Sequence, residues 1–166
     1  MRNGKLLHQN KRSKLSQSDE WWTLQNLYDE LCKEYNFYPE IDVAATKANR
    51  LCTLYFSKKD NALTRDWKIG KKKRKCWNNP PAKEQGKFIA KAKQQWDDLK
   101  IQTMQIVPLN VQSSNAWWIN VLLPSERGEK VFWRAIRHRR KFLYKGRDVG
   151  GSINGYCVVI YGRKQK

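Results

Sequence analysis

The sequence predicts an α/β fold in which helices and strands form three layers. Segments with helical spacing of apolar residues alternate along the chain with short apolar segments typical of buried strands. Towards the end of the chain, two or three strand-like segments follow one another without a helix between them, which predicts a partly antiparallel edge. The length of 166 residues fits a single domain with a real core. We therefore expect one domain at residues 19–162, between a basic flexible arm at 1–18 and a basic tail at 163–166.

Helices are predicted where apolar residues recur every three to four positions. One helix is expected within residues 24–35, with Ser18 or Thr23 as its cap. A second helix begins near Gly86, and a third follows the two serines at 113–114, which can cap it.

Strands are predicted by short apolar segments that contain β-branched and aromatic residues. They are expected at residues 41–42, 76–77, 101–107, 131–136 and 155–161. The last of these has the strongest strand composition. Residues 51–56 fit either a strand or a connecting segment, and residues 124–130 are expected to form a loop.

The segment Trp77-Asn78-Asn79-Pro80-Pro81 ends a strand in a stiff loop. Neither proline has a backbone N–H, and each proline holds the residue before it extended. The Asn79 side-chain oxygen and the loop carbonyls are therefore rigid acceptors that suit an exocyclic amine such as adenine N6. Two acceptors on the N–H bonds of such an amine favour its pyramidal, more nucleophilic form. Taken alone, the stretch also fits an ordinary Asn-Pro turn.

The charge of the chain points to a polyanionic partner. There are 34 Lys and Arg residues against 15 Asp and Glu, which gives a net charge of +19. The eight tryptophans favour nucleic acid over a membrane surface, because aromatic rings stack on bases while cations meet phosphates. The sequence has no apolar run of transmembrane length and no secretory leader, so no membrane partner is expected.

Two internal segments concentrate the positive charge. We expect phosphate contacts from both, although a solvated loop is the plain alternative for the first. The predicted nucleic-acid-binding residues are Lys71, Lys72, Lys73, Arg74, Lys75, Arg139, Arg140 and Lys141.

The four cysteines are scattered and form no Cys-x-x-Cys pair, and the two histidines lie far from useful spacings. A zinc site is therefore not expected, and no other metal is expected either. Reduced thiols of this kind predict an intracellular protein.

Asp42 ends a predicted strand, and the small residues Ala44 and Ala45 after it leave room for a ligand. In open α/β sheets, ligands bind beyond the carboxyl ends of strands, where an acidic residue can hold ribose hydroxyls. Asp42 is the first candidate for such a contact, and a loop carboxylate or helix cap is its alternative. Asp60 is the second candidate, with a solvated carboxylate as the alternative.

Taken together, these elements resemble the phage-type DNA N6-adenine methyltransferase family. The resemblance covers residues 19–160, and it depends on the order and spacing of several short motifs. These are Trp22-Thr23-Leu24, Phe37 with Asp42-Val43-Ala44-Ala45 and Asn49, Lys59-Asp60-Asn61-Ala62-Leu63 with Asp66-Trp67, Asn79-Pro80-Pro81, Ile106-Val107-Pro108, Trp117-Trp118 and Arg140-Lys141-Phe142.

The resemblance implies a Rossmann-like sheet with helices on both faces. It also implies transfer of a methyl group from S-adenosylmethionine to a flipped-out adenine. The catalytic residues that it implies are Asn79, Pro80 and Pro81; the implied cofactor-binding residues are Thr23, Asp42, Ala44, Asp60 and Asn79. The expected partner is double-stranded DNA, with single-stranded DNA as a further substrate. We expect a monomer or weak dimer, which acts in the host cytoplasm if the protein is viral.

Two positions depart from the family pattern: Leu24 replaces a proline that often follows the threonine of the first motif, and the residue after the two prolines also differs. An aromatic residue usually follows the two prolines and stacks on the flipped base, whereas this chain has Ala82. Trp77, Phe88 and Trp117 are the candidates to replace that ring. Two alternatives follow, a nucleic-acid-binding relative without activity and a methyltransferase that acts on a protein amide. The charge of +19 favours DNA over a neutral peptide.

Overall fold

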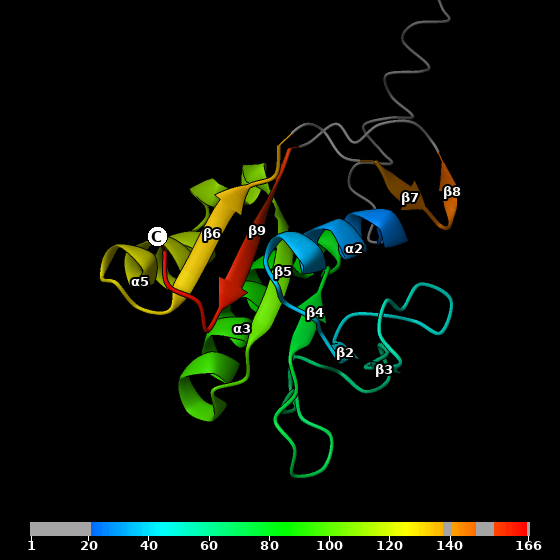
Figure 1. The fold of residues 1–166 in the computed structure, drawn as a ribbon, viewed down its shortest axis with the longest axis horizontal. Coiled ribbons are helices and arrows are strands. Elements are labelled where there is room, and N and C mark those ends of the chain that lie inside the picture. The colour runs from blue at the N-terminus through cyan, green and yellow to red at the C-terminus, as the bar shows by residue number, and fades with distance from the viewer. Residues whose placement is uncertain (1–20, 138–140, 149–154, 166) are drawn as a thin grey trace, which may run out of the picture.

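A six-stranded mixed sheet forms the centre of the molecule in a computed structural model, which describes residues 21–137, 141–148 and 155–165. The strand order is β3-β2-β4-β5-β9-β6 (Figure 1). The bounds of these strands are β2 (Ile41–Asp42), β3 (Leu54–Tyr55), β4 (Cys76–Asn78), β5 (Thr103–Pro108), β6 (Val131–Ala135) and β9 (Tyr156–Tyr161). From β3 to β5 the neighbouring strands are parallel, while β9 is antiparallel to both β5 and β6.

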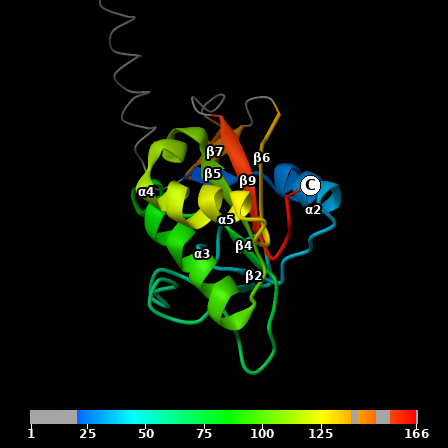
Figure 2. The same cartoon turned by 90° about the vertical axis from the view of Figure 1, so that its left-hand side faces the viewer.

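Helices cover both faces of this sheet, as Figure 2 shows. Helix α2 (Gln25–Glu34) packs on one face, and α3 (Gln85–Leu99) packs on the other. A continuous helical segment lies on the same side as α3; it consists of α4 (Asn115–Trp117), the π-helical turn η3 (Trp118–Leu122) and α5 (Leu123–Glu126). Two short 3-10 helices, η1 (Ala82–Glu84) and η2 (Leu109–Ser113), follow β4 and β5.

Alternation along the central strands explains the three layers, because successive side chains of a strand point to opposite faces. In β4, Cys76 belongs to the buried cluster under α3, whereas Trp77 belongs to the cluster under α2. In β5, Ile106 faces α2 and Val107 faces α3. All four are at most 1% exposed. The predicted three-layer α/β fold is therefore confirmed.

The antiparallel part of the sheet differs in one respect from the expectation. The antiparallel strand is β9, which lies inside the sheet between β5 and β6, so the edge strand at this end is β6. The β-branched composition of β9 fits this inner position, because a strand buried on both faces needs apolar side chains on both.

A second sheet has three short antiparallel strands that the sequence pattern did not predict. It consists of β1 (Trp21–Thr23), β7 (Phe142–Tyr144) and β8 (Arg147–Asp148), in the order β1-β7-β8. Figure 1 shows β7 and β8 beside the start of α2. The turn between them contains Lys145 and Gly146, both with positive φ, which suits a tight hairpin. The ring of Trp22 would lie 2.9 Å from a Cβ atom at residue 146, so only glycine fits beneath it.

Two local expectations need correction. Thr23 belongs to β1 and does not cap α2, whose N-cap residue Leu24 makes no side-chain capping bond. The loop expected at 124–130 begins later, because α5 continues to Glu126. Pro124 is the second residue of α5 and directly follows the junction with the π-helical turn η3. By contrast, Ser114 caps its helix as expected, since its Oγ accepts a hydrogen bond from the N–H of Trp117. The other predicted cap, Ser18, lies outside the described residues.

Candidate active site

The loop after β4 and the loop after β2 leave the sheet side by side. The two strands are parallel, Asp42 is in register with Trp77, and the N–H of Val43 donates to the Trp77 carbonyl. The chain then leaves β2 towards β3 on one side of the sheet and leaves β4 towards β5 on the other. In open α/β sheets, ligands bind at the carboxyl edge where the chain diverges in this way. Asp42 and Asn79 are therefore brought to the same edge.

Strand β1 fixes the side chain of Asn79. The Asn79 Nδ2 donates to the carbonyl oxygen of Trp21 at 3.2 Å and to Oγ1 of Thr23 at 2.9 Å. Because the amide nitrogen faces β1, the Oδ1 atom points away from β1 and can accept a hydrogen bond from a ligand. The hydroxyl of Thr23 thus orients the Asn79 amide, and a cofactor contact from Thr23 stays a prediction.

The Pro80 carbonyl is also held by a side chain, which the sequence did not reveal. The Nε2 of Gln85 donates to this oxygen at 3.1 Å, and Gln85 is only 6% exposed at the start of α3. A carbonyl oxygen has two lone pairs, and Gln85 uses one of them; Pro80 itself is buried. In the sequence, the one sign of this role is a glutamine five residues after Pro80, next to the start of the predicted helix.

Further polar side chains are buried directly behind this loop. Asn78 and Gln105 lie opposite one another in the β4–β5 register, and Thr103 precedes them on β5; all three are fully buried. Burying amides costs free energy that apolar side chains would avoid. These buried polar side chains therefore distinguish this part of the sheet from a purely apolar core.

Asp42 organises the loop that follows β2. It is 3% exposed, and its two carboxylate oxygens accept the backbone N–H groups of Ala44 at 3.2 Å and Leu51 at 3.1 Å. Burial raises the pKa of Asp42 to about 6, although the two backbone hydrogen bonds act in the opposite direction. Ala44, a predicted cofactor-binding residue, thus uses its N–H to close this loop.

The burial of Asp42 predicts a pH dependence of stability. Folding raises its pKa from 3.8 to about 6, so the native state binds a proton more readily than the unfolded chain. The free energy of unfolding should therefore fall by about 3 kcal/mol as the pH rises from about 4 to about 6. Urea unfolding at a series of pH values measures this change.

The Asp42→Asn variant should lose most of that pH dependence. Asp60→Asn is the matched control, because Asp60 is exposed and hydrogen bonds from Ser57 hold its pKa below the usual value. An Asp42→Asn protein with the same pH slope as the wild type would show that another group titrates.

Asp60 lies in an exposed turn after β3. Its Oδ2 accepts hydrogen bonds from the N–H of Ser57 at 2.8 Å and from the Ser57 hydroxyl at 2.7 Å, and Oδ1 lies 3.5 Å from Arg65 Nη1. These contacts shape the turn, which follows the strand next to β2. A cofactor contact from Asp60 stays a prediction.

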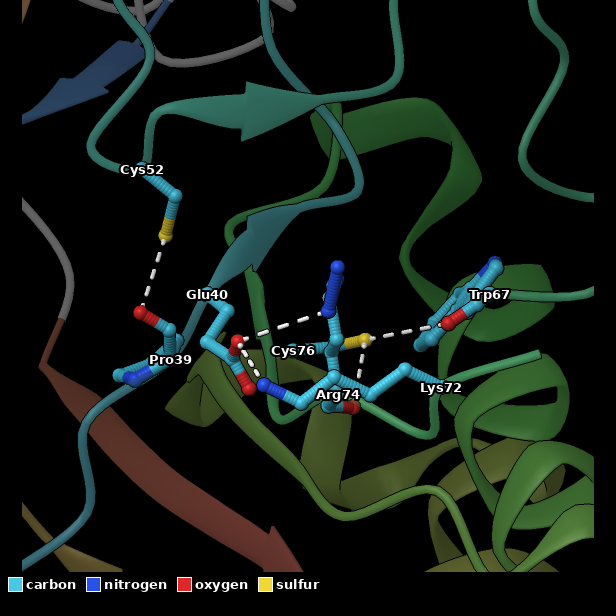
Figure 3. Close-up of polar contacts among 7 residues, drawn as sticks. All are labelled: Pro39, Glu40, Cys52, Trp67, Lys72, Arg74 and Cys76. Carbon is cyan, nitrogen blue, oxygen red and sulfur yellow. Dashed lines mark hydrogen bonds and ion pairs between the residues drawn. The ribbon is translucent and has the colours of Figure 1, made fainter. Parts of the chain in front are cut away.

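The first basic segment, residues 71–75, precedes β4, whereas Asn79 follows it. The three residues of β4 therefore separate the two, and the basic segment lies at the amino end of the strand. Figure 3 shows how it is anchored: Lys72 and Arg74 reach Glu40 at 3.0 and 3.6 Å. The ammonium group of Lys75 lies 5.1 Å from the centre of the Phe37 ring. Phosphate binding by this segment stays a prediction, but it is not adjacent to Asn79.

Of the second basic segment, only Lys141 lies within the described residues. Lys141 immediately precedes β7, whose first residue Phe142 is in register with Thr23, the partner of Asn79. The Lys141 ammonium is exposed and lies 3.6 Å from the Asp148 carboxylate. Arg139 and Arg140 lie outside the described residues.

The three rings expected to replace an aromatic at position 82 are unavailable. Trp77, Phe88 and Trp117 are 1%, 5% and 2% exposed and belong to the core clusters. A base could not stack on them without opening the core, so that expectation is wrong. Ala82 is exposed at the start of η1.

Three further features are the state of the cysteines, possible metal ligands and possible membrane-spanning helices. All four cysteines are free and buried, and burial raises the pKa of each thiol. Within the described ranges, no cluster of three or more metal-ligating side chains occurs. None of the helices in that same part of the chain is long and apolar enough to cross a membrane.

The divergence of the chain at the carboxyl ends of β2 and β4 puts the protein in the class of open α/β folds that bind ligands at this edge. Comparison with known proteins narrows the class: the chain belongs to the family described as DNA N-6-adenine-methyltransferase (Dam), whose model matches residues 10–158.

A relative of known name is the DNA N-6-adenine-methyltransferase of Escherichia phage T1. It is 27% identical over 145 residues, which cover 87% of this chain and 52% of the relative. The chain therefore spans about half the length of that protein. No solved structure matches.

Proposed function

We propose that this protein is a DNA adenine-N6 methyltransferase that uses S-adenosylmethionine. The observation that carries the proposal is the orientation of Asn79, whose amide nitrogen is held by β1 so that Oδ1 faces away from β1. The Pro80 carbonyl follows directly, which gives two fixed acceptors at the carboxyl edge of the sheet. Family membership and the charge of +19 support the same reaction and the same substrate.

The two acceptors would bind the amino group that reacts. Asn79 Oδ1 and the Pro80 oxygen would each accept one N–H bond of adenine N6, which localises the nitrogen lone pair outside the ring plane. Because β1 and Gln85 hold these groups beforehand, little reorganisation is needed when the amine becomes more polar. The contribution of the protein is alignment and electrostatics, without a covalent intermediate.

The adenine would have to leave the duplex to reach this edge. Extrusion of a paired base costs a few kcal/mol, which stacking and edge contacts in the pocket offset. Single-stranded DNA avoids that cost and is a plausible second substrate. The proposed enzyme acts on DNA inside the cell as a monomer or weak dimer, in the host cytoplasm if it is viral.

The carboxyl edge of β2 and β4 suits S-adenosylmethionine, in a Rossmann-like arrangement. Asp42 is buried there and holds the loop at residues 43–51, and the side chains at Ala44 and Ala45 are small. When bound, the cofactor supplies an electrophilic methyl group on a sulfonium. The loop closed by Asp42 would surround the cofactor, and Asp60 would approach from the turn after β3.

Calorimetric titration with S-adenosylmethionine, with and without unmethylated plasmid DNA, tests the proposal. One-to-one binding should occur, and radiolabelled methyl groups should then appear on adenine N6. If the protein binds DNA but neither binds the cofactor nor transfers a methyl group, it is a nucleic-acid-binding relative. Methylation of a glutamine amide in place of adenine would likewise refute the proposal.

The basic segment around β7 should contribute phosphate contacts. Neutralising Arg139, Arg140 and Lys141 with glutamine should lower the slope of log affinity against log salt by about 2 to 3, because each phosphate contact contributes about 0.9. Fluorescence anisotropy with duplex DNA at several salt concentrations measures the slope.

The matched control neutralises Lys33, Arg127 and Lys130, which are three exposed cations away from the Asn79 loop. The slope of this control should stay close to that of the wild type. If the slope of log affinity against log salt falls equally in both triple variants, residues 139–141 act through the general charge of the protein and do not form a phosphate contact site.

A further inference from the structure

The small sheet presents one of its two faces to Asn79. Trp21 and Thr23 are two residues apart on β1, so their side chains lie on the same face. The hydroxyl of Thr23 contacts the Asn79 amide at 2.9 Å, which identifies this face as the one turned towards the catalytic loop. Trp22, between them, lies on the opposite face against Gly146.

Tyr144 completes an aromatic pair on the same face. It is in register with Trp21 across the β1–β7 pair, and residues directly opposite in such a pair share a face. The ring centres of Trp21 and Tyr144 are 5.7 Å apart, and both residues are half-buried. On the core side, Phe142 is 1% exposed and closes this face against Tyr156.

The backbone of Trp21 lies next to the Asn79 amide that would bind the amine. The carbonyl of Trp21 itself accepts a hydrogen bond from Asn79 Nδ2 at 3.2 Å. A purine whose amino group meets Asn79 Oδ1 needs an apolar surface for its ring, because pockets for extruded bases stack the base between aromatic or apolar side chains. Ala82 offers only a methyl group, and Trp77, Phe88 and Trp117 are buried in the core.

We propose that Trp21 and Tyr144 form the stacking surface for the extruded adenine. This inference rests on the proposed function, and it assigns to the β1–β7 pair a second role besides orienting Asn79. The pair is a positioning element: it holds the plane of the base so that N6 meets Asn79 and Pro80. Ala82 then needs no ring of its own.

The test uses binding, so that it does not depend on turnover. The probes are a short duplex with one unpaired adenine and its fully paired counterpart, and the readout is fluorescence anisotropy. The wild-type protein should prefer the duplex with the unpaired adenine, because the extrusion cost is already met. Trp21→Leu should lose about 10-fold in affinity for that duplex and little for the paired one. Trp21→Phe keeps a ring and should stay within about threefold of the wild type.

Two further variants separate stacking from folding. Trp22→Leu is the matched control on the opposite face, and it should disturb the hairpin without lowering the preference for unpaired adenine. If Trp21→Leu fails to fold in thermal unfolding, Tyr144→Leu against Tyr144→Phe provides the same comparison.

The inference is overturned if the wild type shows no preference for the unpaired adenine. It is also overturned if folded Trp21→Leu and Tyr144→Leu keep that preference, or if Trp22→Leu loses as much. Failure of the proposed function would give a different result. A protein that transfers no methyl group can still prefer the duplex with the unpaired adenine, and Trp21→Leu can still remove that preference.

Discussion

Replacing Asn79 by alanine is expected to lower methyl transfer by about 100- to 1,000-fold, because it removes one of two preorganised acceptors. Affinity for DNA should remain within a few-fold of the wild type, since phosphate contacts elsewhere supply most of it. Single-turnover methylation measures the first quantity, and anisotropy with duplex DNA measures the second.

The structure adds controls for this variant. Thr23→Val keeps the shape of β1 but removes the hydroxyl that accepts from Asn79 Nδ2, so it should cause a smaller loss of rate. Asn79→Asp keeps an acceptor oxygen, yet it places a carboxylate where the amide faces the Trp21 carbonyl, and it should also be slow. Normal methylation by Asn79→Ala would remove this residue from the mechanism.

Replacing Trp67 by alanine is expected to reduce the free energy of unfolding by about 3 to 5 kcal/mol. This is a large share of the roughly 5 to 15 kcal/mol of a typical domain. Trp67 is fully buried; its N–H donates to Gln95 Oε1 at 2.6 Å, and its indole N–H donates to the Ala62 carbonyl at 2.7 Å. It thereby attaches the long irregular segment between β3 and β4 to helix α3.

Urea unfolding measures this effect, and two comparisons locate its origin. Trp67→Phe keeps most of the volume but loses the indole hydrogen bond, so it should cost about 1 to 2 kcal/mol. Trp118→Ala removes the same type of ring from a position that is 50% exposed, and it should cost less than about 1 kcal/mol. Equal losses in Trp67→Ala and Trp118→Ala would contradict the anchoring role.

The longer elements could be predicted from the sequence because they carry their own periodicity. Helix α3 shows one apolar face over 15 residues, and β9 has six residues of strongly strand-forming type. The strands of two or three residues have too little pattern to be recognised locally. β1 is such a strand, and its partner β7 lies about 120 residues further along the chain, so only the folded structure brings the two together.

Some residues of the candidate site could be placed from the sequence, and others could not. Asn79 and Asp42 could be placed because Asp42 ends one predicted strand and Asn79 lies two residues after another. Parallel strands bring their carboxyl ends to one edge. Gln85 could not be assigned, since its role depends on where α3 turns back over the Pro80 carbonyl. The basic residues at 71–75 are close to Asn79 in sequence, but β4 separates the two, so the phosphate contacts predicted for them would lie at the amino end of that strand.

The position of β9 has a consequence for how the chain folds. β5 and β6 are made earlier in the chain, but they do not pair with each other, because β9 lies between them. Until β9 arrives, both strands expose backbone edges that another chain could bind. Pairings between residues so distant in sequence form slowly. Refolding should therefore be slow and sensitive to protein concentration, with the completion of the sheet as the late step.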